Sequence, residues 1–349
     1  MNEVAFRELI SGEKQGAAPT LSRLGLRALS WPYGLVVWLR NRAFDAGLKR
    51  VHRVPVPVIS VGNVTVGGTG KTPFVAHLVH WLSERGIQAA LVSRGYRALP
   101  DETNDEKRLL KQLCPGVPHR QNPDRVAAAR AVCREDGAKA IVLDDGFQHR
   151  RLGRDLDIVL IDALNPWGYD ALLPRGLLRE PVASLSRANV IVLTRVDQCS
   201  AEQRQQILAR IHNLQPAAAC VEVAYPPVRL VNVAGQRNEL SSIAGEPVIA
   251  FCGIGNPDAF GQSLRDAGCN LKQLCPFPDH HHFQTGELDD LSRLAEETGA
   301  ATVLTTQKDL VKIDRTELGG CPLWAVEIGA EIVTGADQLD RRLEKLFDN

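Results

Sequence analysis

The sequence predicts an α/β fold in which helices cover a parallel sheet, followed by a smaller second α/β domain. First, a buried apolar run at 56–61 leads through a glycine-rich turn into helical spacing of apolar residues over 74–82. Second, apolar runs and helical segments keep alternating after it, which is typical of a parallel sheet. Third, the alternation breaks at residues 225–227 and then begins again. We therefore expect a core at 54–225 and a smaller α/β domain at 226–349.

The glycine-rich turn has the composition of a phosphate-binding loop. The glycines of Gly67-Gly68-Thr69-Gly70 allow the backbone to curl, so that N–H groups point at an anion near the positive end of the next helix. Lys71 would reach the β- and γ-phosphates of a nucleotide, and Thr72 would place its hydroxyl on Mg²⁺. The usual pattern has its first glycine at the position of Thr65. Strand, loop and helix together predict a core like that of the P-loop NTPases.

Composition excludes several classes of protein. The chain has 349 residues, is 44% hydrophobic and 23% charged, and so is long enough for two domains. Lys plus Arg and Asp plus Glu both number 41, which argues against a nucleic-acid partner. The eight cysteines form no C-x-x-C pair, so we expect neither zinc nor disulfides, and a reducing, cytoplasmic setting. The first twenty residues contain Glu3, Glu8 and Glu13 and have no apolar core, which argues against a signal peptide.

The N-terminal segment at 1–53 contains a basic and aromatic stretch from residue 21 onward. Arginines alternate there with Leu, Trp and Tyr, and only Asp45 is acidic. Arg27, Arg40 and Pro32 interrupt the apolar run, so it is too short to span a bilayer. Two alternatives remain open on this stretch alone: an amphipathic helix in the headgroup region of an anionic membrane, or an amphipathic helix packed on the domain.

Further strands and helices follow the phosphate loop in alternation. We expect strands at 88–93, 140–143, 156–161 and 190–193. A helix at 123–135 would have Asn122 as its cap and Pro123 in its first turn. A helix from Ser200 would begin with a capping box that Gln203 completes.

Carboxylates follow two of these strands. Asp144 and Asp145 end the apolar run at 140–143, as expected of a buried strand that delivers a carboxylate to Mg²⁺. A strand-end turn with exposed acids is the alternative. A second acidic stretch, 101–106, lies beyond the strand at 88–93, on the side of a parallel sheet where ligands bind.

The second domain contains an unusual histidine stretch. Strands are expected near 247–252, 271–276, 301–304 and 323–327, with a helix opened by Asn256 and Pro257. His280, His281 and His282 follow Asp279. They could bind a metal, one of them could transfer a proton with Asp279 as its partner, or the loop could simply be solvated.

Taken together, the chain resembles the tetraacyldisaccharide 4′-kinase family, from about residue 20 to its C-terminal end. The loop of that family also carries Thr at the first glycine position. The matching stretches, in family order, are Val61–Pro73, Ser93–Tyr96, Asp105-Glu106, Asp124-Arg125, Asp144–His149, Leu173–Pro181, Phe277–His281 and Thr305–Lys312.

The resemblance implies transfer of the ATP γ-phosphate to the 4′-hydroxyl of an acylated glucosamine disaccharide 1-phosphate. ATP and Mg²⁺ would be the cofactors, with no nucleic acid and no obligatory protein partner. The place would be the cytoplasmic face of the inner membrane, with peripheral or monotopic association through a basic N-terminal helix. The resemblance therefore favours the membrane alternative for residues 1–53.

The resemblance also implies roles for individual residues. Lys71 and Thr72 would hold phosphate and Mg²⁺, with Asp144 and Asp145 on the metal side. Asp105 would accept the proton of the sugar hydroxyl, although the family's Gly-Asp-Glu reads Asn104-Asp105-Glu106 here. His280 would pair with Asp105 from the second domain. Further residues expected at the site are Glu106 beside the metal and, toward substrate, Asn63, Gln148, His149, Arg179 and Glu180.

Two other classes of function remain as alternatives. Thr194-Arg195-Val196-Asp197 follows a strand and loosely matches the guanine-reading T-K-x-D of a regulatory GTPase or metallochaperone, with Arg195 in place of lysine. A metal-binding module would instead use His280 to His282.

Overall fold

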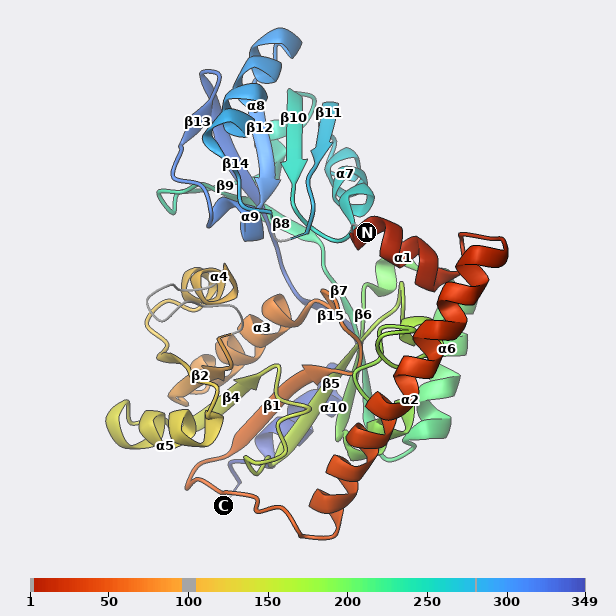
Figure 1. The fold of residues 1–349 in the computed structure, drawn as a ribbon. Coiled ribbons are helices and arrows are strands. Elements are labelled where there is room, and N and C mark those ends of the chain that lie inside the picture. Colours follow the sequence, from red (N-terminus) through yellow and green to blue (C-terminus); the bar gives the residue numbers. More distant parts are fainter. Residues whose placement is uncertain (1–2, 96–104, 280, 349) are drawn as a thin grey trace. The chain divides into compact units, whose positions relative to one another are not determined.

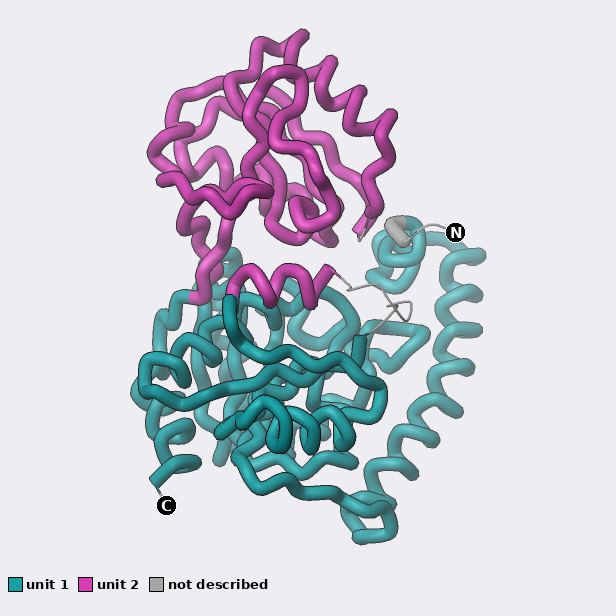
Figure 2. Tube along the Cα trace, turned by 90° about the vertical axis from the view of Figure 1, so that its left-hand side faces the viewer, with its two compact units in different colours: residues 1–96, 114–224, 331–349 teal, residues 97–113, 225–330 magenta. Residues whose placement is uncertain are grey.

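The computed structural model describes residues 3–95, 105–279 and 281–348, and the chain forms two compact units (Figure 2). The first unit consists of residues 1–96, 114–224 and 331–349, and the second of residues 97–113 and 225–330. This division differs from the predicted one in two places. The C-terminal 331–349 returns to the first unit, and 97–113 belongs to the second.

The first unit is built on a sheet of eight strands in the order β15-β7-β6-β5-β1-β4-β2-β3 (Figure 1). All neighbours pair in parallel except β15, which runs antiparallel to β7. Because β1 lies at the centre, its C-terminal end is flanked by the ends of β4 and β5. The strands are β1 Val58–Asn63, β2 Ala89–Ser93, β3 His119–Gln121, β4 Ala140–Asp144, β5 Leu156–Asp162, β6 Val190–Thr194, β7 Ala219–Ala224 and β15 Glu331–Thr334.

Helices bury their apolar faces on this sheet, which confirms the predicted fold class. α3 contacts β1, β2 and β4, and α10 contacts β7. α5 packs its alanines and valines against β1, β2 and β4, while α6 packs Ile207 and Ile211 against β5 and β6. The helices of this unit are α1 Glu3–Ser11, α2 Ala17–Asp45, α3 Lys71–Glu84, α5 Arg125–Glu135, α6 Ala201–Leu214 and α10 Ala336–Glu344.

Of the three helix starts with a predicted cap, those at Ser200 and Asn256 were correct and the one at Asn122 was not. Ser200 and Gln203 form the expected capping box at α6. At α5 the N-cap is Asp124, whose carboxylate accepts from the N–H groups of Val126 and Ala127. Asn122, the predicted cap, instead accepts from the N–H of Asp124. The helix thus begins two residues later, because the aspartate competes successfully for the free N–H groups of the first turn.

The second unit has its own sheet, in the order β11-β10-β12-β14-β8-β9, with β13 paired to β14. β11, β10, β12 and β14 are parallel, whereas β8 pairs antiparallel with β14. The strands are β8 Pro227–Val231, β9 Arg237–Asn238, β10 Pro247–Cys252, β11 Asn270–Pro276, β12 Thr302–Thr306, β13 Glu317–Leu318 and β14 Cys321–Ile328. The helices are α4 Asp105–Leu113, α7 Pro257–Asp266, α8 Thr285–Thr298 and α9 Gln307–Leu310.

The C-terminal segment is an integral part of the first unit. The side chains of Leu339 and Leu343 on α10 are fully buried. Asp340 accepts a 2.8 Å hydrogen bond from the indole Nε1 of Trp81 on α3. The last helix therefore contributes to the same core as the phosphate loop helix.

We expect Leu339→Ala to lower the free energy of unfolding by about 2–5 kcal/mol, because it removes buried methyl groups and leaves a cavity. Urea unfolding of the full chain would measure this change. Val333→Ala on β15, where the side chain is 46% exposed, serves as the control and should cost much less. Equal effects of the two substitutions would contradict the placement of α10 in the core.

Candidate active site

The phosphate loop lies between the end of β1 and the start of α3. Gly67 has φ 121° and Gly70 has φ 79°, both in the left-handed region that favours glycine. A Cβ added at Gly67 or Gly68 would meet no described atom within 4 Å. The loop is therefore curled and open on its glycine side, as a phosphate cradle requires.

The structure explains why Thr65 can replace the usual first glycine. Residues 64–66 pair with residues 177–179, through the N–H of Val66 to Leu177 O and the N–H of Arg179 to Val64 O, both 2.7 Å. Thr65 itself forms an antiparallel bridge with Leu178. An extended, paired residue needs no left-handed backbone, so a side chain is tolerated here.

Lys71, Asp145 and Arg179 form a charged cluster beside the loop. Lys71 Nζ lies 3.6 Å from Asp145 Oδ1, and Arg179 Nη1 lies 2.9 Å from both carboxylate oxygens of Asp145. Burial alone would raise the pKa of Asp145, but Lys71 and Arg179 outweigh burial and hold this pKa below its ordinary value. Asp145 also has φ 51°, which is uncommon for a residue other than glycine. The end of β4 thus presents an ionised carboxylate to two cations.

Two amide side chains connect this cluster to the loop backbone. Asn63 Oδ1 accepts from Lys71 Nζ at 3.3 Å, and Asn63 Nδ2 donates to Thr65 O at 2.7 Å. Gln148 Nε2 donates to Asn63 O at 2.9 Å. The structure therefore brings together five of the predicted site residues in the first unit: Asn63, Lys71, Asp145, Gln148 and Arg179.

Asp144 and Thr72 offer the oxygen atoms that suit Mg²⁺. Asp144 ends β4 directly beside β1 and is 5% exposed, while Thr72 lies in the first turn of α3. Carboxylate and hydroxyl oxygens are the donors that this hard cation prefers. Since Asp145 already faces two cations, Asp144 is the better candidate ligand of the pair.

Arg125 is a site residue to which the sequence analysis assigned no role. It is the first residue of α5, is 5% exposed, and its Nη1 donates to Asp145 O at 3.2 Å. The signal available in the sequence was the stretch Asp124-Arg125, one of those that carry the family resemblance. Its position opposite the end of β4 depends on tertiary packing.

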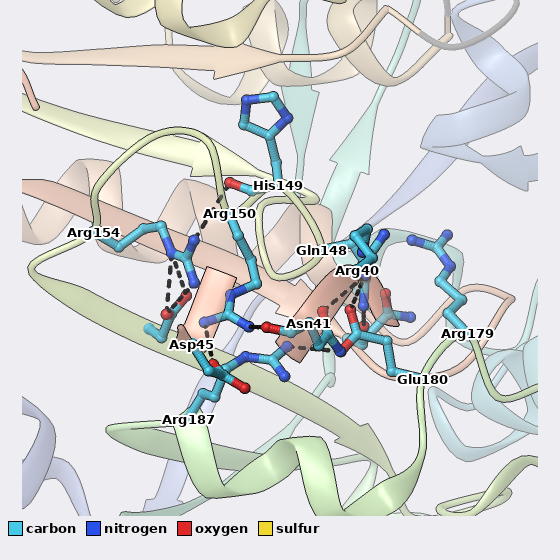
Figure 3. A network of polar contacts seen from close by, with 12 residues as sticks. Arg40, Asn41, Asp45, Gln148, His149, Arg150, Arg154, Arg179, Glu180 and Arg187 are labelled. Atoms are coloured by element: carbon cyan, nitrogen blue, oxygen red, sulfur yellow. Dashed lines mark hydrogen bonds and ion pairs between the residues drawn. The ribbon is translucent and has the colours of Figure 1, made fainter. Parts of the chain in front are cut away.

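Glu180 occupies a position that differs from the one expected. Glu180 was predicted to line the site, but its side chain is fully buried and accepts from Arg40, Asn41 and Arg187 (Figure 3). His149 is partly buried, and its predicted role toward substrate stays a prediction. Burial, together with the charges of Arg125, Arg151 and Arg154, lowers the pKa of His149 to about 4, so its imidazole is neutral at pH 7.

The second unit carries the predicted base. Asp105 begins α4, and its Oδ2 lies 3.6 Å from the Nζ of Lys312, a side chain that is 3% exposed. Asp105 was expected to belong to the core and to meet His280 from the other domain. The structure instead assigns α4 to the same unit as the histidine stretch, because Arg108 donates to Val311 O and α4 packs on α9. His280 lies outside the described residues.

Two neighbours of these residues in the second unit are also placed. Glu106 follows Asp105 on α4 and is exposed. His281 forms a 2.8 Å contact between its Nε2 and Glu287 Oε2 on α8. The predicted metal-side role of Glu106 is untested and stays a prediction.

The stretch compared with a guanine-reading motif instead supports the phosphate loop. Thr194 Oγ1, fully buried, donates to Thr69 O at 3.1 Å. Arg195 Nη2 donates to Gly68 O at 2.7 Å, and Nη1 forms an ion pair with Asp162. Because the carbonyl groups of Gly68 and Thr69 accept hydrogen bonds from residues at the end of β6, these residues stabilise the curled loop.

The sequence of this chain was compared with protein families and with known proteins. A family model described as Tetraacyldisaccharide-1-P 4′-kinase matches residues 22–348. The chain belongs to this family. It is 37% identical over 350 residues to the tetraacyldisaccharide 4′-kinase of Anaeromyxobacter dehalogenans strain 2CP-C, which covers 95% of this chain and 92% of that relative. It is 41% identical over 322 residues to that of Anaeromyxobacter sp. strain Fw109-5, which covers 87% and 86%.

A solved structure of a tetraacyldisaccharide 4′-kinase family member supports both fold and ligand. The LpxK of Aquifex aeolicus in complex with ATP is 27% identical and aligns with a TM-score of 0.72, covering 93% of this chain and 99% of that one. The predicted resemblance and the predicted fold class are thereby confirmed. The roles of individual residues stay predictions.

We expect Arg195→Met to raise the KM for ATP by roughly ten- to hundredfold, because the loop would lose a hydrogen bond from a charged donor. Steady-state kinetics with varied ATP would measure this. Arg210→Met is the matched control, since Arg210 pairs with the exposed side chain of Asp170 and stacks over Trp167, and none of its described contacts is with the phosphate loop. An unchanged KM for ATP in Arg195→Met would refute the supporting role of the β6 end.

Proposed function

We propose that this chain transfers the γ-phosphate of ATP to the 4′-hydroxyl of tetraacyldisaccharide 1-phosphate, which forms lipid IVA in lipid A biosynthesis. The observation that carries the proposal is the open glycine cradle with Lys71, Asp145 and Arg179 beside it, in a chain that matches the kinase family over residues 22–348.

The first unit would bind the triphosphate. Loop N–H groups and the start of α3 would face the phosphate oxygens, and Lys71 would reach the β- and γ-phosphates. Arg179 would add a second positive charge, since its guanidinium lies beside the same carboxylate as Lys71. Phosphoryl transfer passes through a loose transition state, so positioning and charge stabilisation account for most of the catalysis.

Thr72 and Asp144 would hold Mg²⁺, with Asp145 and Glu106 as further carboxylates on the metal side. The ion would supply positive charge to the β- and γ-phosphate oxygens. Asn63 and Gln148 would keep Lys71 and the loop backbone in place through the hydrogen bonds described above.

The second unit would supply the group that accepts the proton of the sugar hydroxyl. Asp105 is 16% exposed, and its carboxylate lies next to the buried ammonium of Lys312. His280 would pair with Asp105 to orient it. Since the alkyl hydroxyl has a very high pKa, the base mainly orients the nucleophile and takes its proton late. The smaller unit would also exclude water when it closes over the acceptor.

The α2 helix would hold the protein at the cytoplasmic face of the inner membrane. Its large apolar side chains are turned outward: Leu21, Leu24, Leu29, Trp31, Leu35, Val36, Trp38 and Leu39 are each 51–77% exposed. Its buried residues are Ser30, Val37 and Asn41. This arrangement is the reverse of a helix packed on a core, and it suits a helix lying in the headgroup region.

A spanning helix is not part of this proposal. No helix within the described residues combines the length and apolar character needed to cross a bilayer. Association would therefore be peripheral or monotopic.

A transfer assay tests the reaction. Purified protein is given labelled ATP or GTP, with and without the acylated disaccharide 1-phosphate. We expect label on the lipid from ATP, and a loss of roughly 10²-fold or more in Lys71→Ala and in Asp105→Asn, which remove phosphate-site charge and the base respectively.

Matched controls are Lys139→Ala and Asp258→Asn, which alter exposed residues of the first and second units. Both controls should keep wild-type turnover. Hydrolysis of GTP without lipid would instead support the switch alternative, and wild-type turnover in Asp105→Asn would remove the proposed base.

We expect Trp31→Ser combined with Leu35→Ser to weaken binding to anionic vesicles strongly, since each substitution removes about 1.5–3 kcal/mol of apolar burial. Vesicle co-sedimentation would measure this. Val228→Ser, at a side chain 44% exposed in the second unit, is the control. If the double variant bound vesicles as well as the wild type, the anchoring role of α2 would be contradicted.

A further inference from the structure

The inward side of α2 carries buried Val37 together with several polar side chains, and these polar side chains bind one segment of the first unit, Leu172–Glu180. Ser30 Oγ donates to Leu172 O at 3.0 Å and accepts from the N–H of Arg175 at 3.1 Å. Tyr33 Oη donates to Arg179 O at 2.9 Å. The inward side of α2 therefore contacts the first unit, while the outward apolar side chains are exposed.

Glu180 is the most strongly held residue of this segment. Its buried carboxylate accepts from Arg40 Nη2 at 2.7 Å and from Asn41 Nδ2 at 3.0 Å, both on α2 (Figure 3). Arg187 Nη2 adds a third bond at 2.8 Å. Burial alone would raise the pKa of Glu180, but these donors hold its pKa below the ordinary value. A buried carboxylate paired in this way tolerates little displacement.

The other side of the same segment contacts the phosphate site. The N–H of Arg179 donates to Val64 O, and Leu177 O accepts from the N–H of Val66, so the segment pairs with the first part of the phosphate loop. The Arg179 guanidinium contacts Asp145. Leu172–Glu180 thus lies between α2 and the phosphate loop, with a hydrogen bond or ion pair at each junction.

We infer that α2 positions Arg179 for phosphoryl transfer, with Tyr33, Arg40 and Asn41 as positioning residues that act through the backbone of Arg179 and the carboxylate of Glu180. The helix that faces the membrane is then also part of the support of the active site. This inference rests on the proposed function, because it takes Arg179 to be the arginine that faces the phosphates.

Turnover should therefore depend on α2 even where membrane binding does not limit the reaction. With the acceptor dispersed in detergent micelles, the outward variant Trp31→Ser should keep the wild-type kcat. An inward variant should lose kcat while it keeps wild-type binding to vesicles.

Tyr33→Phe is the principal variant, because it removes one hydroxyl and no packing volume. In micelles we expect its kcat to fall by roughly three- to tenfold, the equivalent of one hydrogen bond, with unchanged KM for the acceptor. Asn41→Ala, which leaves Arg40 and Arg187 on Glu180, should act in the same direction. Ser22→Ala is the matched control, since its hydroxyl bonds only Ala18 O within α2 among the contacts described. It should leave kcat unchanged.

A double-mutant cycle with Arg179→Ala separates positioning from general weakening of the fold. If Tyr33 acts through Arg179, then Tyr33→Phe should have no further effect on kcat once Arg179 is removed. The same proportional loss in both backgrounds, or wild-type kcat in both Tyr33→Phe and Asn41→Ala, would overturn the inference.

The cycle also distinguishes the inference from the proposed function. Wild-type kcat in Arg179→Ala would remove Arg179 from the proposed site. A large loss in Arg179→Ala beside wild-type kcat in the α2 variants would leave the proposed function standing and reject the positioning role of α2.

Discussion

The phosphate site depends on the ion pairs that Asp145 forms with Lys71 and Arg179. Two cations so near each other would repel, and each would be mobile on its long side chain. One carboxylate at the end of β4 fixes both at 3.6 and 2.9 Å from its oxygens. Because Lys71 also donates to Asn63, the cation next to the glycine loop is oriented before a nucleotide binds. Preorganised charge of this kind contributes more than charge that must be reoriented during the reaction.

Local patterns in the sequence predicted most of the first unit. The apolar runs became buried strands, and the capping box at Ser200 formed because its signal lies within four consecutive residues. The start of α5 moved from Asn122 to Asp124, since two neighbouring capping side chains compete and sequence alone does not rank them. The N-terminal stretch left two alternatives open. The apolar side chains of α2 that stay exposed support the membrane alternative as a proposal, and sequence alone does not tell which face the rest of the chain covers.

Features that depend on long-range contacts were not predictable from local patterns. Glu180 follows Arg179 in the sequence, yet one side chain is fully buried on α2 while the other faces the phosphate loop. Arg195 reaches Gly68 over 127 residues of chain, which no local pattern encodes. Asp105 looked like part of the core because it follows a core strand, but packing of α4 on α9 assigns it to the second unit. In each case the residue type indicated a charged or polar role, but the sequence did not indicate which distant residue it would contact.

The chain enters the second unit after β7 and returns from it at β15, and these two strands pair directly, with Ala224 opposite Glu331. Residues 225–330 are therefore an insertion whose two ends meet as neighbouring strands of one antiparallel pair. A tight hairpin turn could join those ends without altering the sheet. A chain shortened in this way would keep the strand order of the first unit, but α4 would lose the packing on α9 that assigns residues 105–113 to the second unit.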